Sequence, residues 1–391
     1  MTAIDSTLNS TESKFSTIDT RLIAAQGRPA GFDYMRLVLA IAVIAMHSVI
    51  IASGWRADLE QWNSSARPVL RSILPMFFAL SGFLVAGSFE RSRTVAMFFG
   101  LRVIRIYPAL VVEVILSAFL LGTVFTTLSL GEYFAHPTFH VYLLNMLGEP
   151  HYELPGVFLD NPNPGQVNRQ LWTVPYELAC YASLALISLA GGRTMRYFAP
   201  LVAALLTVAY IVGRHIKYAG DVPETVGPLG GPLLVICFLV GVGLFSYRRE
   251  LKMNGALGAG ALLAGFACVS VVPGGDFVAP WFLGYATVYL GTMNPKRIIL
   301  LVGADYSYGL FLYGYPIQQA LVALIPGQTP LVNTVMATIV AAMFAGVSWH
   351  LIERPALRLR KPMQRAENRH LAARAAKQGE ADSGLAARRL D

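Results

Sequence analysis

The stretch FDYMRLVLAIAVIAMHS, residues 32–48, decides the fold class of this chain. It is almost wholly apolar, and an apolar run of about 20 residues is long enough to cross the hydrocarbon core of a bilayer as a helix. Arg36 and His47 interrupt it. Eleven helical steps bring these two residues to within about 20° of the same helix face, about 16 Å apart. The run therefore predicts a membrane-spanning helix that carries a polar stripe.

Composition extends this interpretation to the whole chain. Of 391 residues, 55% are hydrophobic and only 14% are charged, whereas about 25% are charged in a typical soluble domain. Charged, Pro or Gly breaks separate further apolar runs of spanning length. We predict an all-α protein, a polytopic transmembrane bundle of about ten helices, at residues 34–52, 69–89, 106–126, 171–190, 198–213, 230–246, 255–272, 277–292, 298–325 and 331–352.

The Lys and Arg residues predict the orientation, because short cytoplasmic loops carry an excess of both. If the N-terminus lies inside, the inner loops receive most of them. The outer side receives Arg56, Arg67, Arg71, Arg169, Arg214 and Lys217. Both termini are therefore predicted to be cytoplasmic, and the net charge of +8 reflects this topology and attraction to anionic lipid. We expect no nucleic-acid partner, since no groove of interleaved basic and aromatic residues is evident.

The two ends of the chain differ from its middle. Residues 1–30 are rich in Ser and Thr and lack the pattern of a signal peptide, so we expect a disordered cytoplasmic tail. We expect residues 31–358 to form the membrane domain and residues 359–391 to form a basic cytoplasmic tail. Cys180, Cys237 and Cys268 each stand alone, without the paired spacing of a metal or redox site, so we expect no metal.

The polar stripe of the first span is the leading candidate for a functional site. The topology places Arg36 near the cytoplasmic boundary and His47 near the bilayer midplane, where an ionisable side chain is costly and marks a site facing the bundle. Asp33 is close enough in sequence to pair with Arg36. The alternative is that Arg36 snorkels as a topology anchor and His47 makes an interhelical hydrogen bond.

Two carboxylates also lie within apolar sequence. Glu177 enters the membrane from the outer side, so it could meet His47, fix its tautomer and raise its basicity. The alternative is an ion pair between Glu177 and an outer cation such as Arg169. Glu113 could pair with an arginine or help to hold a ligand, and the sequence does not choose between these.

A basic segment follows the second span. Arg102 and Arg105 are three residues apart and share a helix face, and guanidinium groups bind phosphate bidentately. The excess of Lys and Arg in cytoplasmic loops explains Arg91 and Arg93 as well as phosphate binding does. In the preceding helix, small residues near Ser81 allow close backbone approach, for helix packing or for a substrate channel.

Six motifs in this order resemble the membrane-bound acyltransferase family 3, over residues 31–358. They are the Arg36–His47 stretch, FFALSGFL (77–84), LRVIRIYP (101–108), LWTVPYE (171–177), ADYSYGLFLYGYPIQ (304–318) and HLIERPALRL (350–359). One departure concerns the late motif, where many members carry a histidine shortly before the proline and this chain reads Tyr313, Gly314, Tyr315, Pro316. That departure puts a second catalytic histidine in doubt.

The resemblance implies a role for each group of residues. Arg36 and His47 would be the essential pair, and acetyl-CoA or another acyl-CoA would be the co-substrate on the cytoplasmic side, with no tightly bound cofactor. The donor would be bound by Arg102, Arg105, Ser81, Gly82 and Phe83. Together with the residue patterns above, which single out Asp33 and Glu113, the expected supporting or acceptor-side residues are Asp33, Glu113, Trp172, Tyr176, Ser307 and Tyr308.

The predicted function is therefore a membrane O-acyltransferase of the bacterial inner membrane. It would move an acetyl or other short acyl group from acyl-CoA to a hydroxyl of a glycan, such as exopolysaccharide, lipopolysaccharide or a lipid-linked saccharide. His47 would act as general base, with Glu177 orienting its ring. The alternative is a transporter of a glycan precursor or small solute, in which His47, Glu177 and Glu113 form a proton relay.

Overall fold

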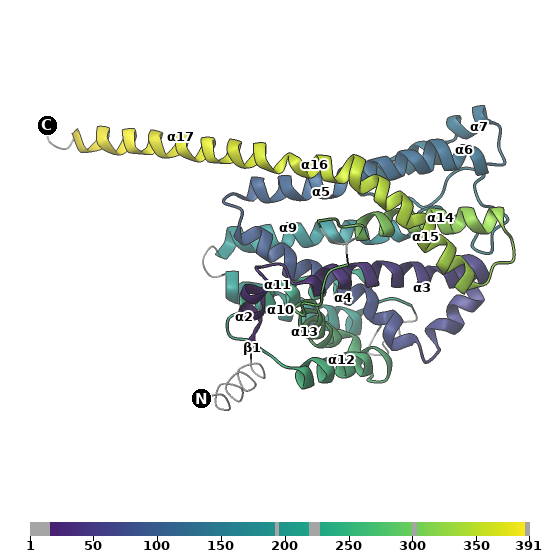
Figure 1. Cartoon of the computed structure of the whole chain (residues 1–391), viewed down its shortest axis with the longest axis horizontal. Coiled ribbons are helices and arrows are strands. Elements are labelled where there is room, and N and C mark those ends of the chain that lie inside the picture. The colour runs from purple at the N-terminus through teal and green to yellow at the C-terminus, as the bar shows by residue number, and fades with distance from the viewer. Residues whose placement is uncertain (1–15, 192–194, 219–226, 299–302, 388–391) are drawn as a thin grey trace.

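The computed structural model describes residues 16–191, 195–218, 227–298 and 303–387, and these are mainly helical. The elements in chain order are β1 (Ser16–Thr17), α2 (Ile18–Ala24), α3 (Ala30–Trp62), α4 (Arg67–Glu90), α5 (Val95–Ile115), η2 (Leu116–Leu121), α6 (Gly122–Phe125), α7 (Leu130–Ala135), α8 (Pro137–Tyr142), η3 (Leu143–Leu147), η4 (Arg169–Thr173), α9 (Val174–Gly191), α10 (Met195–Lys217), α11 (Gly231–Ser246), β2 (Lys252–Met253), α12 (Gly255–Ser270), η6 (Gly275–Phe277), α13 (Ala279–Gly291), α14 (Ser307–Leu324), α15 (Pro330–Ser348), η8 (Trp349–Glu353), α16 (Arg354–Arg358) and α17 (Arg360–Ala387). Many of the long helices run in similar directions (Figure 1).

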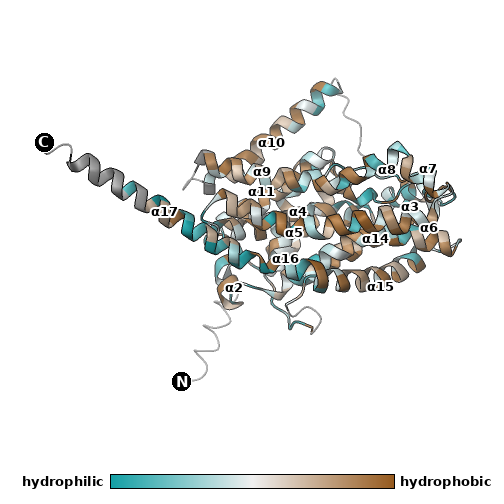
Figure 2. Cartoon of the chain, turned by 90° about the horizontal axis from the view of Figure 1, so that it is seen from above, coloured by the Kyte–Doolittle hydropathy of each residue, from teal (hydrophilic) through white to brown (hydrophobic). Residues whose placement is uncertain are grey.

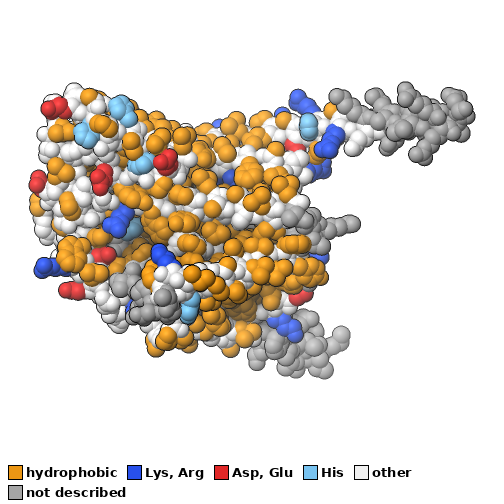
Figure 3. Space-filling view, turned by 180° about the vertical axis from the view of Figure 1, so that it is seen from behind, with side chains coloured by type: hydrophobic (Ala, Val, Ile, Leu, Met, Phe, Trp, Pro, Cys, Tyr) orange, Lys and Arg blue, Asp and Glu red, His pale blue; other side chains and the backbone are white. Residues whose placement is uncertain are grey.

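The prediction of an all-α membrane protein is confirmed. Among the described residues, five helical stretches are long and apolar enough to cross a membrane, beginning at Ala30, Arg67, Val95, Tyr197 and Pro330. Hydrophobic residues predominate along the helices of the body (Figure 2). On the face shown in Figure 3, charged side chains lie mainly toward the two ends of the body, and the middle is largely apolar. Each of the ten predicted runs overlaps a helix, although residues 299–302 of the run 298–325 lie outside the described residues. That ten helices cross the bilayer stays a prediction.

Polar caps mark where several of these apolar helices begin. Thr94 accepts a hydrogen bond from the backbone N–H of Met97 at the start of α5. Asn254 caps α12 and Thr329 caps α15 in the same way. Each cap satisfies a backbone donor that the first helical turn leaves without an intrahelical partner.

Glycines bring α4 and α11 into backbone contact. A Cβ atom at Gly82 would lie 1.9 Å from the carbonyl oxygen of Phe238, and one at Gly241 would lie 2.1 Å from that of Ala79. Any side chain at either position would force the helices apart, so these glycines fix their close approach. Gly82 therefore serves helix packing, one of the two roles left open for the small residues of this segment.

The described N-terminal residues differ from the predicted disordered tail. Residues 1–15 of that tail lie outside the described residues, but β1 pairs with β2 and Ile18 is fully buried. The carboxylate of Asp19 also binds Arg248, with Oδ1 to Nε at 3.2 Å. Apolar burial and this ion pair hold residues 16–24 against the body. In the C-terminal tail, α17 extends away from the body at the same end as α2 (Figure 1).

The chain reverses direction inside α3. Gly54 has φ 81° and ψ −178°, a region open essentially only to glycine. Beyond it, the side-chain nitrogen of Gln61 donates to the carbonyl oxygen of Met46 at 3.3 Å, although fifteen residues of straight helix would separate them by about 22 Å. The predicted span 34–52 is thus the first limb of α3, and residues 55–62 fold back beside its outer part.

We expect Gly54→Ala to lower the free energy of unfolding by about 1–3 kcal/mol, the cost of holding a side chain in this backbone region. The new Cβ would also lie 3.2 Å from the carbonyl oxygen of Pro162. Thermal unfolding in detergent measures the change. Gly213→Ala is the control, because Gly213 lies inside α10 with nothing within 4 Å of an added Cβ. Equal melting of the Gly54→Ala variant and the wild type would contradict this reversal.

Candidate active site

Two cavities lie end to end within the helical body. We name the first, of about 150 Å³, the inner cavity; Arg36, Arg102 and Arg105 are among its lining residues. We name the second, of about 410 Å³, the outer cavity; His47 and Arg169 are among its lining residues. Four residues line both cavities and form a collar between them: Val43, Leu74, Thr173 and Phe311.

One face of the first span runs past both cavities and the collar between them. Arg36, Val43 and His47 lie at spacings of seven and four residues, which place them on one helix face. They line the inner cavity, the collar and the outer cavity in that order. The predicted stripe is therefore present in the structure, and it runs from one cavity to the other.

An ion-pair network closes around the guanidinium groups of the inner cavity. Arg36 donates to Asp33 Oδ1 and to Asp305 Oδ2, each at 2.8 Å, so the predicted Asp33–Arg36 pair is confirmed. Arg105 donates to the same Asp305 oxygen at 2.5 Å and to Glu353 Oε2 at 3.1 Å. One carboxylate thus joins two helices, α3 and α5, by holding an arginine from each.

The Asp305 carboxylate is ionised and contacts both Arg36 and Arg105. Burial acts to raise the pKa of Asp305, but the positive charges of Arg36 and Arg105 and hydrogen bonds from Ser307 outweigh it, and the pKa lies well below its usual range. The Ser307 hydroxyl donates to Asp305 Oδ1 at 2.6 Å. The carboxylate is therefore negative at neutral pH and fixes both guanidinium groups.

Two arginines of the inner cavity keep donors free. Within the described residues, the buried Nε atoms of Arg36 and Arg102 have no hydrogen-bond partner. Arg102 otherwise donates to Ser88 at 3.0 Å and lies over the rings of Phe98 and Tyr181. Because buried donors normally have partners, these two point to a ligand with acceptor oxygens.

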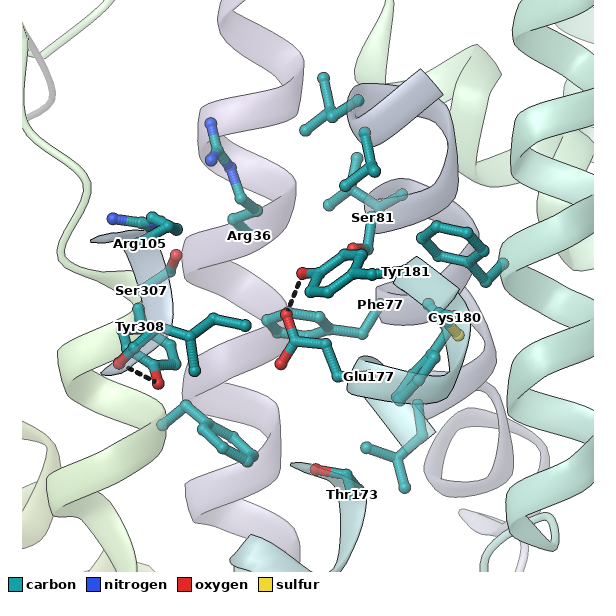
Figure 4. A pocket seen from close by; sticks show the side chains of 18 of the residues that line it. Arg36, Phe77, Ser81, Arg105, Thr173, Glu177, Cys180, Tyr181, Ser307 and Tyr308 are labelled. Atoms are coloured by element: carbon teal, nitrogen blue, oxygen red, sulfur yellow. Dashed lines mark hydrogen bonds between the residues drawn. The ribbon is translucent and has the colours of Figure 1, made fainter. Parts of the chain in front are cut away.

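Glu177 lies in the inner cavity and accepts a hydrogen bond from the Tyr181 hydroxyl. In Figure 4 it lies between Arg36, near the top of the view, and Thr173, at the bottom. Across the part of the chain described, no hydrogen bond joins Glu177 to His47, and no ion pair joins it to Arg169. Glu177 follows Thr173 by one turn toward the inner side, whereas His47 follows Val43 by one turn toward the outer side. These opposite directions separate the two residues by roughly 12 Å along the bundle, so the predicted contact between them is not made.

An aromatic ring, Tyr315, and a cation, Arg169, lie near His47. Its ring lies edge-on to Tyr315, with ring centroids 5.1 Å apart, and the charge of Arg169 acts on it. Asn163 donates to the Tyr315 hydroxyl at 2.6 Å and so holds that ring. His47 makes no hydrogen bond to any described side chain, so its ring nitrogens are available to a ligand in the outer cavity.

The other predicted residues divide between the cavities and the packing. Ser81, Ser307 and Tyr308 line the inner cavity, and Trp172 lines the outer one. Phe83 is buried against Phe32 and, like Gly82 and Tyr176, lies outside both linings. This differs from the donor-binding role predicted for Gly82 and Phe83, because their face of α4 packs on neighbouring helices while Ser81 faces the cavity.

Glu113 belongs to a separate buried network. It is 1% exposed and accepts hydrogen bonds from Ser117 at 2.6 Å and from Asn168 at 2.8 Å. No arginine pairs with it among the described residues, so the first of its two predicted roles is not seen. Its second oxygen has no partner in the same part of the chain.

Three residues that contact the predicted site residues were not predicted from the sequence: Asp305, Glu353 and Tyr181. The signal for the first two was present, since Asp305 belongs to ADYSYG and Glu353 to HLIERP. Asp305 lies within the predicted run 298–325 and Glu353 directly follows the run 331–352. A carboxylate in either place needs a cation. Tyr181 carried no such signal, because an aromatic residue in a span is ordinarily a packing residue.

For the acyl transfer that the sequence predicts, we expect Arg36→Lys to lower the rate about tenfold or more. The arginine fork reaches Asp33 and Asp305 through separate nitrogens, whereas a lysine presents a single point charge. The rate of transfer by purified protein measures the effect. Arg358→Lys, in α16 on an exposed surface, is the control, and equal losses in both variants would contradict a specific role for the fork.

Comparison with known proteins identifies the family of this chain. Residues 30–352 match the family described as an acyltransferase domain, and the chain belongs to this family, acyltransferase family 3. It is 27% identical to a protein named O-acetyl transferase from Shigella phage Sf6, over 83% of this chain and 94% of that protein. It is also 27% identical to Nodulation protein 10 from Rhizobium leguminosarum bv. viciae, over 86% of this chain and 95% of that protein. No solved structure matches the chain.

Family membership makes this chain an enzyme, a multi-pass membrane acyltransferase. The name of the phage relative agrees with transfer of an acetyl group to oxygen. These findings favour an enzyme over a transporter, the alternative that the sequence left open.

Proposed function

We propose that the chain transfers an acetyl or other short acyl group from acyl-CoA to a hydroxyl of a glycan, such as exopolysaccharide, lipopolysaccharide or a lipid-linked saccharide. The observation that carries this proposal is the pair of cavities that share the collar, with Arg36, Arg102 and Arg105 on one side and His47 and Arg169 on the other. Two substrates can thus approach one another from opposite ends.

The donor enters the inner cavity. The free Nε atoms of Arg36 and Arg102 suit the acceptor oxygens of phosphate groups. The pantetheine arm of CoA then runs past Glu177 to the collar, so that the thioester reaches Val43, one turn from His47. The positive-inside pattern supports a cytoplasmic position for this end, where acyl-CoA is available, and the proposed location of the protein is the bacterial inner membrane.

The acceptor enters the outer cavity. His47 takes the proton of its hydroxyl, and the oxygen attacks the thioester carbonyl carbon. The carbon–sulfur bond breaks, and CoA leaves as a thiolate that is then protonated, which yields the ester. An acyl-histidine intermediate would give the same products in two steps.

The test is the release of free CoA by membranes that contain the protein. With acetyl-CoA and a glycan acceptor present, CoA should appear together with acetylated glycan, and omitting the acceptor should abolish both. Mass spectrometry of surface glycans from a deletion strain and its complemented parent then identifies the acyl increment. Identical glycans in the two strains would overturn the proposal.

A further inference from the structure

The reversal at Gly54 brings a second carboxylate to the outer cavity. Asp58 and Trp62 lie on the folded-back limb of α3 and line this cavity together with His47. The side-chain nitrogen of Gln61 donates to Asp58 Oδ1 at 2.6 Å and to the carbonyl oxygen of Met46 at 3.3 Å. Gln61 therefore ties Asp58 to the turn of helix that carries His47.

Two opposite charges in this cavity remain unpaired. Asp58 and Arg169 both line it, yet within the described residues neither forms an ion pair. Only Oδ1 of Asp58 is engaged there, by Gln61, so Oδ2 can accept a further hydrogen bond. Charged groups held apart around a half-enclosed cavity suit a ligand that hydrogen-bonds to both.

Aromatic side chains complete the walls. Trp62, which is 5% exposed, lies on the limb, and Tyr152 and Trp172 line other parts of the cavity. Flat aromatic faces beside a few polar groups suit a ring with apolar faces and a hydroxylated edge. A pyranose sugar has this form.

We infer that residues 55–62 select the acceptor, and that Asp58 binds a sugar hydroxyl next to the one that is acylated. This inference rests on the proposed function and assigns its acceptor specificity to the folded-back limb. Asp58 holds the ring through Oδ2 so that the neighbouring hydroxyl points at His47, while Trp62 packs on a face of the sugar.

The test uses Asp58→Asn, which keeps the shape of the side chain and removes its charge. Methyl α-D-glucoside, methyl α-D-galactoside and methyl α-L-rhamnoside serve as acceptors with radiolabelled acetyl-CoA. For the best acceptor, we expect the KM to rise about 10- to 100-fold, as befits a lost hydrogen bond to a charged group, and the KM for acetyl-CoA to stay unchanged. Glu60→Gln is the matched control, because Glu60 lies on the same limb outside the cavity lining. An unchanged acceptor KM, or a fall in kcat alone, overturns the inference.

Binding is measured separately from transfer. Trp62 and Trp172 line the cavity, so intrinsic fluorescence should report titration with the same glycosides. In the wild type, the monodeoxy analogue that lacks the bound hydroxyl should weaken binding by the same factor as Asp58→Asn, and the two changes together should add nothing further. The comparison of the glycoside with its monodeoxy analogue in the wild type needs no variant to fold.

The two measurements separate the inference from the proposed function. Glycoside binding that depends on Asp58, without any acetyl transfer, leaves the inference standing and rejects the proposed function. Acetyl transfer with the same acceptor KM in Asp58→Asn as in the wild type rejects the inference and leaves the proposed function standing. Absence of binding by all three glycosides overturns the inference.

Discussion

His47→Ala should lower acyl transfer by about 10² to 10⁴-fold, the usual contribution of a general base. His47 lies in the outer cavity one turn beyond Val43, which lines the collar where the thioester would meet the acceptor. The acceptor hydroxyl would keep its proton in the variant and attack slowly. Transfer from acetyl-CoA by purified protein measures the loss, and thermal melting verifies that the variant is folded.

The control for this prediction is His140→Ala. His140 lies in α8 with an exposed side chain and lines neither cavity, so its removal should leave transfer unchanged. Transfer by His47→Ala at the wild-type rate would reject His47 as the base and leave the two cavities without a catalytic group at their junction.

Asp305→Asn should lower the free energy of unfolding at pH 7 by about 3 kcal/mol, as expected when one partner of a largely buried ion pair is removed. Arg36 and Arg105 would then face one another without the carboxylate that both contact. Because the pKa of Asp305 lies below its usual range, its stabilisation is complete above the unfolded pKa of about 3.9 and is lost as the pH falls further. Melting in detergent at pH 7 measures the effect.

The same substitution should raise the KM for acetyl-CoA, because the fixed positions of the two guanidinium groups are lost. Asp160→Asn is the control: Asp160 is exposed and forms no ion pair within the described residues. An Asp305→Asn variant that melts with the wild type would show that Asp33 and Glu353 hold the two arginines unaided.

Local properties explain what the sequence predicted well. Spanning length, the loops rich in Arg and the i, i+3 pairing of Asp33 with Arg36 depend on residues close together in the chain, and the structure contains these features. The common face of Arg36 and His47 follows from helix geometry alone. Family motifs then indicated an acyltransferase before any geometry was known.

Contacts between distant positions account for what was missed. Glu177 was expected to reach His47, but the two helices carry them to opposite sides of the collar. Gly82 and Phe83 belong to a family motif, yet whether each faces a cavity or a neighbouring helix depends on how α4 is rotated in the bundle. Asp305 needed two partners, at positions 36 and 105, that only the folded chain brings together.

The sequence by itself thus determined a helical membrane protein with a polar stripe on its first span, because periodicity and hydropathy act within single helices, and its motifs indicated the acyltransferase family. The tertiary structure alone decided the collar, the Asp305 bridge and the reversal that sets Asp58 in the cavity of His47. These depend on how helices pack and on one glycine in a backbone region closed to other residues, and neither leaves a regular pattern in the sequence.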